Sequence, residues 1–249
     1  MNKDKLNLFL KRFGVEVHGI GYIQKLKNSS VSKSEWDKQF ELLKGKAGTI
    51  LDVGAAVGDT VVKYAELFPN AKIHAFEPFP ESFETLHTRF RRNSNIVLNK
   101  QALSDQFGGA TMNVNKMVDT NSMLKSKNIG ATSDKSCETV GQIYIDTDTL
   151  DNYCFRNKIK KIDILKLDVQ GFEIEVLKGA HNFLQDNAIK MVFVESYFEQ
   201  QYFDQPLFHE IAAVLYKWGF VLQDLYDPYF SSSNILWCDA LFINKHYSY

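Results

Sequence analysis

The stretch "TILDVGAAVGDTVVKYAELF" at 49–68 places a short apolar strand, a glycine turn and an amphipathic helix directly after one another. A strand that enters a helix through a turn containing Gly54 and Gly58 is typical of parallel α/β sheets, where such turns hold nucleotide-like cofactors. The stretch therefore favours an α/β fold with a binding site at the carboxyl end of this strand.

Strands and helices alternate after this turn. Strands are predicted at 49–53, 72–77, 95–103, 162–168, 190–195, 220–226 and 239–244, and helices at 58–68, 80–92, 172–184 and 206–218. Strands separated by single helices favour right-handed crossovers and a mostly parallel sheet. The last two strands have no helix between them and should form an antiparallel pair at one edge. We therefore predict a Rossmann-like, seven-stranded sheet with helices on both faces.

The chain of 249 residues suffices for one α/β domain with additions. Residues 1–45 are interpreted as an N-terminal helical extension, with amphipathic helices at 4–13 and after Ser34, and residues 46–249 as the main domain. Between 105 and 148 the periodicity lapses into a segment rich in Gly, Ser, Thr and Asn. We interpret this segment as an inserted hairpin that serves as a lid or binding loop.

Composition and charge argue against nucleic-acid and membrane binding. The net charge of −1 lacks the basic excess of a general nucleic-acid binder. No apolar run reaches the roughly 20 residues of a membrane helix. The three cysteines are far apart and without metal-ligand spacing, which indicates thiols in a reducing compartment. The sequence therefore predicts a cytoplasmic protein with no membrane partner, and it leaves the oligomeric state open.

The glycine turn itself favours one cofactor over another. It reads G-x-A-x-G followed by Asp59, rather than the dinucleotide pattern G-x-G-x-x-G. A carboxylate at the start of the helix would repel a pyrophosphate, whereas S-adenosylmethionine carries no phosphate and its positive charges suit acids such as Asp52. We therefore favour S-adenosylmethionine and keep an NAD(P)-binding oxidoreductase as the alternative.

Further cofactor contacts are predicted after the second and third strands. Glu77 ends the second strand in "HAFEP", where its two oxygens could accept hydrogen bonds from both hydroxyls of a ribose. The other interpretation makes Glu77 a helix-capping acid before Pro78. Ser104 and Asp105 could bind the adenine edge, or they could only form a turn.

Acids also follow the later strands, in "KLDVQGFE" and "FVES". Asp168 ends a strand, Lys166 points to the same side of it, and Glu173 lies in the first turn of the next helix. These groups could steer a polar acceptor, bind an ammonium or hold a divalent cation, which the pattern does not require. Alternatively, Asp168 caps the helix and Glu173 complements its dipole. Glu195 ends the following strand and could act as a general base or a ligand.

The order of these motifs resembles the FkbM family of S-adenosylmethionine-dependent methyltransferases, which have the class I methyltransferase fold. The resemblance rests on "ILDVGAAVGDTVVKYAELFPNAKIHAFEPFPESF", "NKQALSDQFGGATMNVN", "IDTDTLDNY", "IDILKLDVQGFEIEVLKGA", "GFVLQDLY" and "DALFIN", which together extend over about residues 45–244. It implies methylation of a hydroxyl group, often on a sugar or a secondary metabolite.

The resemblance also implies roles for individual residues. The cofactor would be contacted by the glycine turn and by the ends of the next strands: Asp52, Gly54, Ala55, Gly58, Glu77, Pro78, Ser104, Asp105 and Asp168. Two positions depart from the family pattern. Ala56 replaces a glycine, which we expect to require a negative φ at this residue. Gln170 stands where glutamate is common, which argues against a metal-binding role for that position.

Methyl transfer to a neutral hydroxyl needs a base. We predict that Asp168 or Glu195 orients or deprotonates the acceptor, and that Lys166 supports the charge. The acceptor would be a small molecule or a carbohydrate that could stack on an aromatic cluster at Tyr197, Phe198, Tyr202 and Phe203. Two alternatives remain open, an RNA or protein methyltransferase and a catalytically silent binding module.

Overall fold

The computed structural model describes residues 33–127, 137–231 and 234–247. The chain divides into two units, Met1–Lys38 and Gln39–Tyr249. The helix expected at 4–13 lies outside the described residues. The helix expected after Ser34 is α3 (Glu35–Leu42), and the Ser34 hydroxyl accepts the backbone N–H of Asp37. The domain boundary that we placed at 45/46 stays a prediction.

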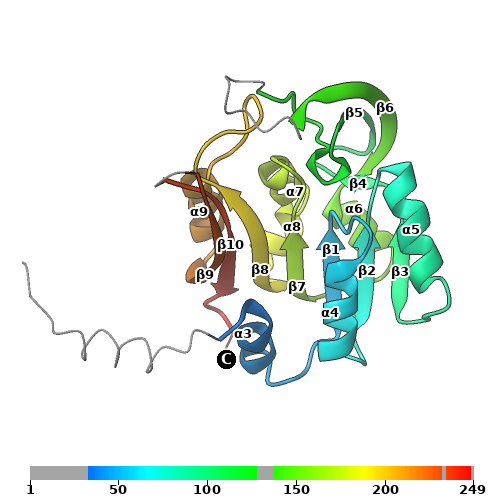
Figure 1. The fold of residues 1–249 in the computed structure, drawn as a ribbon. Coiled ribbons are helices and arrows are strands. Elements are labelled where there is room, and N and C mark those ends of the chain that lie inside the picture. The colour runs from blue at the N-terminus through cyan, green and yellow to red at the C-terminus, as the bar shows by residue number, and fades with distance from the viewer. Residues whose placement is uncertain (1–32, 128–136, 232–233, 248–249) are drawn as a thin grey trace, which may run out of the picture. The chain divides into compact units, whose positions relative to one another are not determined.

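A seven-stranded sheet forms the centre of the second unit (Figure 1). Its strands, in spatial order, are β3 (Ile96–Asn99), β2 (Lys72–Phe76), β1 (Thr49–Val53), β7 (Ile162–Leu167), β8 (Ile189–Tyr197), β10 (Asn234–Asn244) and β9 (Phe220–Ser231). Neighbouring strands from β3 to β8 pair in parallel, and β10 runs antiparallel to both β8 and β9. The order reverses between β1 and β7. The predicted parallel sheet with an antiparallel edge pair is confirmed.

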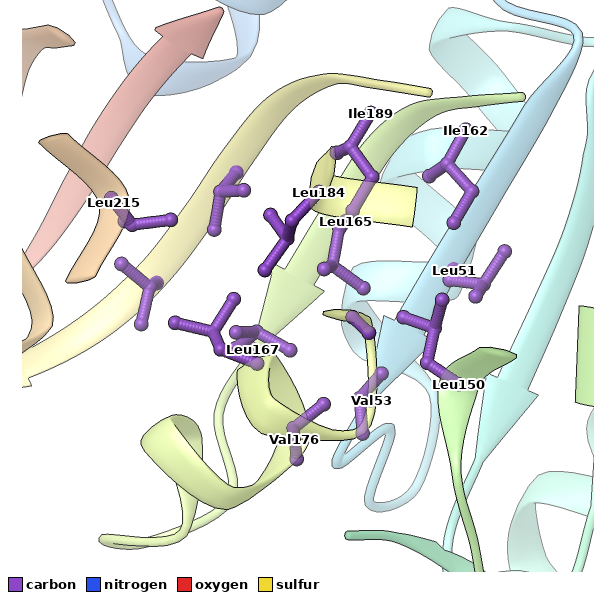
Figure 2. Close-up of a cluster of buried hydrophobic side chains, with 14 of the residues drawn as sticks. Leu51, Val53, Leu150, Ile162, Leu165, Leu167, Val176, Leu184, Ile189 and Leu215 are labelled. Atoms are coloured by element: carbon purple, nitrogen blue, oxygen red, sulfur yellow. The ribbon is translucent and has the colours of Figure 1, made fainter. Parts of the chain in front are cut away.

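Helices cover both faces of this sheet, because alternate strand residues are buried on opposite sides. Leu51 and Leu165 pack with the helices α6 to α9 in one apolar cluster (Figure 2). Ile50 and Ile164 point to the opposite face, where α4 and α5 contact β1, β2 and β3. The helices are α4 (Asp59–Leu67), α5 (Pro80–Phe90), α6 (Leu150–Arg156), α7 (Glu173–Lys178), α8 (His181–Gln185) and α9 (Phe208–Lys217).

The inserted segment forms a second sheet with the order β4 (Ala102–Leu103), β6 (Thr139–Asp148) and β5 (Gly108–Asn115). Strands β5 and β6 form the expected antiparallel hairpin, and the short helix η1 (Val118–Thr120) follows β5. Figure 1 shows this sheet at the carboxyl ends of β1 and β2. The predicted strand 95–103 is wrong as one unit, because Ala102 and Leu103 leave the first sheet and pair with Thr147 and Asp148.

Two helix predictions also need correction. The expected helix at 172–184 is divided into α7 and α8 at Gly179, where an added Cβ would lie 2.0 Å from the carbonyl oxygen of Ser104. This close approach of two backbones holds the chain at the break. Helix α6 was not predicted, although the Thr149 hydroxyl caps it by accepting the N–H of Asn152. The sequence carried a signal for the start of this helix, because Thr149 is a favourable N-cap residue and Asp151 follows in the first turn.

Candidate functional site

The glycine turn after β1 is held against the loop after β7. The N–H groups of Gly54 and Ala55 both donate to the carbonyl oxygen of Phe76, at 3.0 and 2.9 Å. Gly54 has a φ of 80°, and an added Cβ would lie 1.8 Å from the carbonyl oxygen of Asp168. Only glycine permits both the conformation and this approach. The ends of β1 and β7 therefore form one continuous wall.

Ala56 departs from our expectation, because its φ is 45° rather than negative. The left-handed conformation costs a non-glycine residue about 1–2 kcal/mol. The N–H of Ala56 donates to Oε2 of Glu77 at 2.9 Å, a hydrogen bond to a buried carboxylate that offsets part of this cost. The turn thus keeps its shape without the middle glycine.

Glu77 joins the turns that follow β1 and β2. Its Oε1 accepts the N–H of Phe79 at 2.7 Å, while its Oε2 accepts that of Ala56. Burial raises the pKa of Glu77 to about 7, against the lowering effect of these two hydrogen bonds. Each oxygen keeps a second lone pair for another donor. Glu77 can therefore support the turn and still accept hydrogen bonds from a ligand.

Lys166 lies behind this wall rather than in the cavity. Its Nζ is 3.3 Å from both Asp52 Oδ1 and Asp168 Oδ2, and it donates to the carbonyl oxygen of Gly54 at 3.0 Å. Burial lowers the pKa of Lys166, but the charges of Asp168 and Asp52 outweigh it and keep the pKa above its ordinary value. For Asp52, burial raises the pKa and Lys166 opposes the rise. The ammonium thus ties the glycine turn to Asp168.

The loop after β7 and the end of β8 bring two acids together. Nε2 of Gln170 donates to Asp168 Oδ1 at 3.0 Å and to Glu195 Oε2 at 2.8 Å. Burial raises the pKa of Glu195 well above its ordinary value, with further contributions from nearby carboxylates, of which Asp168 is the largest. A buried carboxyl group with a raised pKa at the wall of a cavity is a candidate for proton transfer.

A cavity of about 520 Å³ lies over these groups at the carboxyl ends of β1, β2, β7 and β8. The second sheet and the residues after β5 form its opposite wall, so the insert is part of the site. Four carboxylates line the cavity, those of Glu77, Asp119, Asp168 and Glu195. Within the described part of the chain, no lysine, arginine or histidine lines it.

The predicted site residues fall into three groups. Those that line the cavity are Gly54, Glu77, Pro78, Asp168 and Glu195. Those that support its wall from outside are Asp52, Ala55, Gly58 and Lys166. Ser104 and Asp105 lie elsewhere, because β4 turns the chain into the second sheet and Asp105 lines a separate depression with Thr149 and Asn182. They do not line the cavity, and their assignment to the adenine stays a prediction.

Several lining residues were not predicted, among them Gln170, Asn121, Met123 and Trp237. Gln170 carried a signal, its departure from glutamate, whereas Asn121 and Met123 reach the cavity only through the fold of the insert. Of the expected aromatic cluster, Tyr197 lines the cavity. Tyr202 is fully buried and Phe198 stacks on Phe208.

Among the described residues, no group of three or more His, Cys, Asp or Glu side chains is arranged to hold a metal ion. In the same part of the chain, no helix has the length and apolarity to cross a membrane.

Comparisons with known proteins place the chain among methyltransferases. The model of the Methyltransferase FkbM domain matches residues 52–222. The 2-O-methyltransferase NoeI of Sinorhizobium fredii is 24% identical over 67% of this chain and 68% of its own length. The hexuronic acid methyltransferase AglP of Haloferax volcanii is 28% identical over 58% of this chain and 54% of its own length. Among solved structures, magnesium protoporphyrin IX methyltransferase of Synechocystis PCC 6803 matches 98% of this chain and 95% of its own at 11% identity and a TM-score of 0.49.

Proposed function

The chain belongs to the FkbM family of methyltransferases, which use S-adenosylmethionine, and we propose that it methylates a hydroxyl group of a carbohydrate or related small molecule. The observation that carries the proposal is the charge of the cavity, which presents four carboxylates and, among its described lining residues, no cation. In their ionised form these acids attract a sulfonium and an ammonium and repel a pyrophosphate, and a bound cation would favour ionisation of Glu77 and Glu195, whose pKa values burial raises. This favours S-adenosylmethionine over a dinucleotide.

The residues present fit this methyl donor. Glu77 keeps free lone pairs beside the glycine turn, where they can accept the hydroxyls of a ribose. Because Gly54 has no side chain, the turn lies directly against the end of β7, and one cavity extends over both. When bound, the donor supplies an electrophilic methyl group on sulfur. Asp168 and Glu195 line the same cavity farther along this wall, at the ends of β7 and β8, where an acceptor hydroxyl could meet that methyl.

The nature of the acceptor is supported by the relatives and by the cavity. NoeI is named a 2-O-methyltransferase and AglP a hexuronic acid methyltransferase. At the cavity, Trp237 lines the wall, and the ring of exposed Tyr229 stacks on it at 5.5 Å and 13°. Aromatic faces of this kind give an apolar surface for one side of a sugar ring. We therefore place the acceptor between this pair and the two acids.

The donor is tested by calorimetry. We expect S-adenosylmethionine and its demethylated product to bind and NADH not to bind. Glu77→Ala should weaken S-adenosylmethionine binding at least about tenfold, the loss of one or two hydrogen bonds to a charged group. Glu81→Ala, an exposed acid in the next helix, is the matched control and should bind as the wild type does. Binding of NADH alone would overturn the proposal.

The acceptor is tested by transfer of a labelled methyl group to a panel of monosaccharides, uronic acids and nucleotide-sugars. Once a substrate is found, Trp237→Ala should raise its KM several-fold, and Trp237→Phe should retain most of the affinity. Phe230→Ala removes an exposed ring that does not line the cavity and should have no effect. Methylation of RNA or protein but of no member of the panel would contradict the proposed acceptor.

We also propose the cytoplasm as the compartment. Cys154 and Cys238 are buried thiols, and burial raises the pKa of each to about 12, which keeps them protonated. Thiols in this state suit a reducing environment. Fractionation of the native cells would test this, and recovery of the protein outside the cytoplasm would contradict it.

A further inference from the structure

The Gln170 side chain is hydrogen-bonded at the cavity wall through both its nitrogen and its oxygen. Its Nε2 donates to the carboxylates of Asp168 and Glu195, at 3.0 and 2.8 Å. Its Oε1 lies 3.1 Å from the hydroxyls of both Tyr197 and Tyr202. Both N–H donors of the amide are used, and its oxygen accepts the Tyr197 hydroxyl, whereas the single hydroxyl proton of Tyr202 is shared with the carbonyl oxygen of Thr120, which lies closer at 2.8 Å. One neutral side chain thus connects the two acids of the site.

The backbone of Gln170 is fixed as firmly as its side chain. Its φ is 52°, a left-handed conformation that costs a residue other than glycine about 1–2 kcal/mol. Its carbonyl oxygen accepts the Ser122 hydroxyl at 2.6 Å, and Glu173 Oε1 accepts the N–H groups of Gly171 and Val169 on either side. Strain that is held by this many contacts is typical of functional loops. The backbone is therefore held in the conformation from which the amide reaches both acids.

The neutrality of this side chain matters because other acids surround Glu195. Asp168 faces it from the loop after β7, Glu173 from α7 and Asp239 from β10, while a hydrogen bond from Tyr197 on its own strand lowers its pKa. Burial and these negative charges raise the pKa of Glu195. A hydrogen bond donated to a carboxylate favours its ionised form and so opposes this rise. A carboxylate at position 170 would instead add charge and remove both donors.

We propose that Gln170 is a positioning residue that holds Asp168 and Glu195 as an unequal pair. Asp168 pairs with the Lys166 ammonium at 3.3 Å, and Glu195 takes the proton of the acceptor hydroxyl. This inference rests on the proposed function, because it assigns the base of that same reaction. It also explains why an amide, and not an acid, is suited to this position.

The proposed methyl transfer conserves atoms and charge. The acceptor oxygen forms a bond to the methyl carbon, and the carbon–sulfur bond breaks with its electron pair moving to sulfur. The O–H bond of the acceptor breaks, and its proton forms a new bond to a Glu195 carboxylate oxygen. The sulfonium charge and the carboxylate charge are both neutralised, which a low-dielectric cavity favours.

The test follows the carboxyl carbons of Glu195 and Asp168 by ¹³C NMR across the pH range in which the protein stays folded. We compare the full-length wild type with Gln170→Ala and Gln170→Glu, and assign the signals with Glu195→Gln and Asp168→Asn. Gln170→Ala should raise the titration midpoint of Glu195 by about one pH unit through loss of the donor, and Gln170→Glu should raise it further. The matched control is Gln185→Glu, an exposed residue at the end of α8, which should leave the midpoint unchanged.

A second measurement needs no variant. In the wild type labelled with ¹⁵N-glutamine, the side-chain NH₂ signal of Gln170 should shift with the same midpoint as Glu195. A flat Gln170 signal, or unchanged Glu195 midpoints in the folded variants, would overturn the inference. Both readouts use ligand-free protein, so they remain valid if S-adenosylmethionine fails to bind. That failure would count against the proposed function, whereas loss of the coupling counts against Gln170.

Discussion

The two sides of the cavity are held together by different kinds of hydrogen bond. On the side of β1 and β2, backbone N–H groups of the turns converge on one carboxylate, that of Glu77. On the side of β7 and β8, side chains bind other side chains around Gln170. Backbone contacts fix the first side to the path of the chain, whereas the second can be altered one residue at a time. We expect the first side to be constant in shape and the second to set the chemistry.

The sharpest test of this contrast is Lys166, which contacts both sides. Lys166→Met would leave Asp52 buried without its counter-charge, and we expect a loss of about 3–5 kcal/mol in the free energy of unfolding. Urea denaturation measures this loss. Lys178→Met, in a more exposed i,i+3 pair with Glu175, should cost less than about 1 kcal/mol. Similar losses in the two variants would show that the buried lysine does not join the two sides.

Gly54 tests a contact between two backbone segments, in which no side chain takes part. Gly54→Ala places a Cβ 1.8 Å from the carbonyl oxygen of Asp168 in a residue with φ of 80°, and should cost about 3 kcal/mol or more. Thermal unfolding and calorimetry with S-adenosylmethionine would show the loss of stability and of binding. Gly141→Ala adds the same methyl group where no atom lies within 4 Å and should change neither.

The contrast also explains what the sequence could predict. The strand, turn and helix at 49–68 and the position of Glu77 at the end of β2 could be predicted from local sequence patterns. The contact between Glu77 and Ala56 joins two adjacent strands, so it follows once these elements are placed. The Gln170 network joins positions 122, 195 and 202, which only the folded insert and β8 bring together. The division of the helix at Gly179 likewise depends on a distant carbonyl, that of Ser104.

Glu77 makes the backbone side sensitive to pH. Its pKa is about 7 in the folded chain because of burial, above its ordinary value of 4.5, so the folded state binds this proton more tightly than the unfolded state. Its contribution to stability is therefore greatest below pH 4.5 and is lost as the pH rises through about 7, by roughly 3 kcal/mol at most.

Glu77→Gln should make stability depend less steeply on pH over this window. Denaturation midpoints of the variant and the wild type, compared at several pH values, give the difference in slope. Glu173, whose pKa burial also raises to about 7, should keep part of the dependence in the variant. Glu81→Gln, in an exposed position, serves as the control, and an equal slope in all three proteins would rule out Glu77 as a source.

The smallest expected effect concerns Ala56, where the backbone side carries a residue that its conformation does not favour. With φ at 45°, Ala56→Gly should relieve left-handed strain and raise the free energy of unfolding by about 0.5–1 kcal/mol, after the added flexibility of the unfolded chain is subtracted. The N–H that donates to Glu77 is kept.

Ala47→Gly, at a position without a positive φ, should instead lower stability by about 0.4–1 kcal/mol. Opposite signs in the two variants are expected, because only at Ala56 does the turn demand a conformation that glycine adopts freely. A loss at both positions would mean that contacts of the Ala56 methyl group outweigh the strain, and that this side of the cavity also depends on side-chain packing.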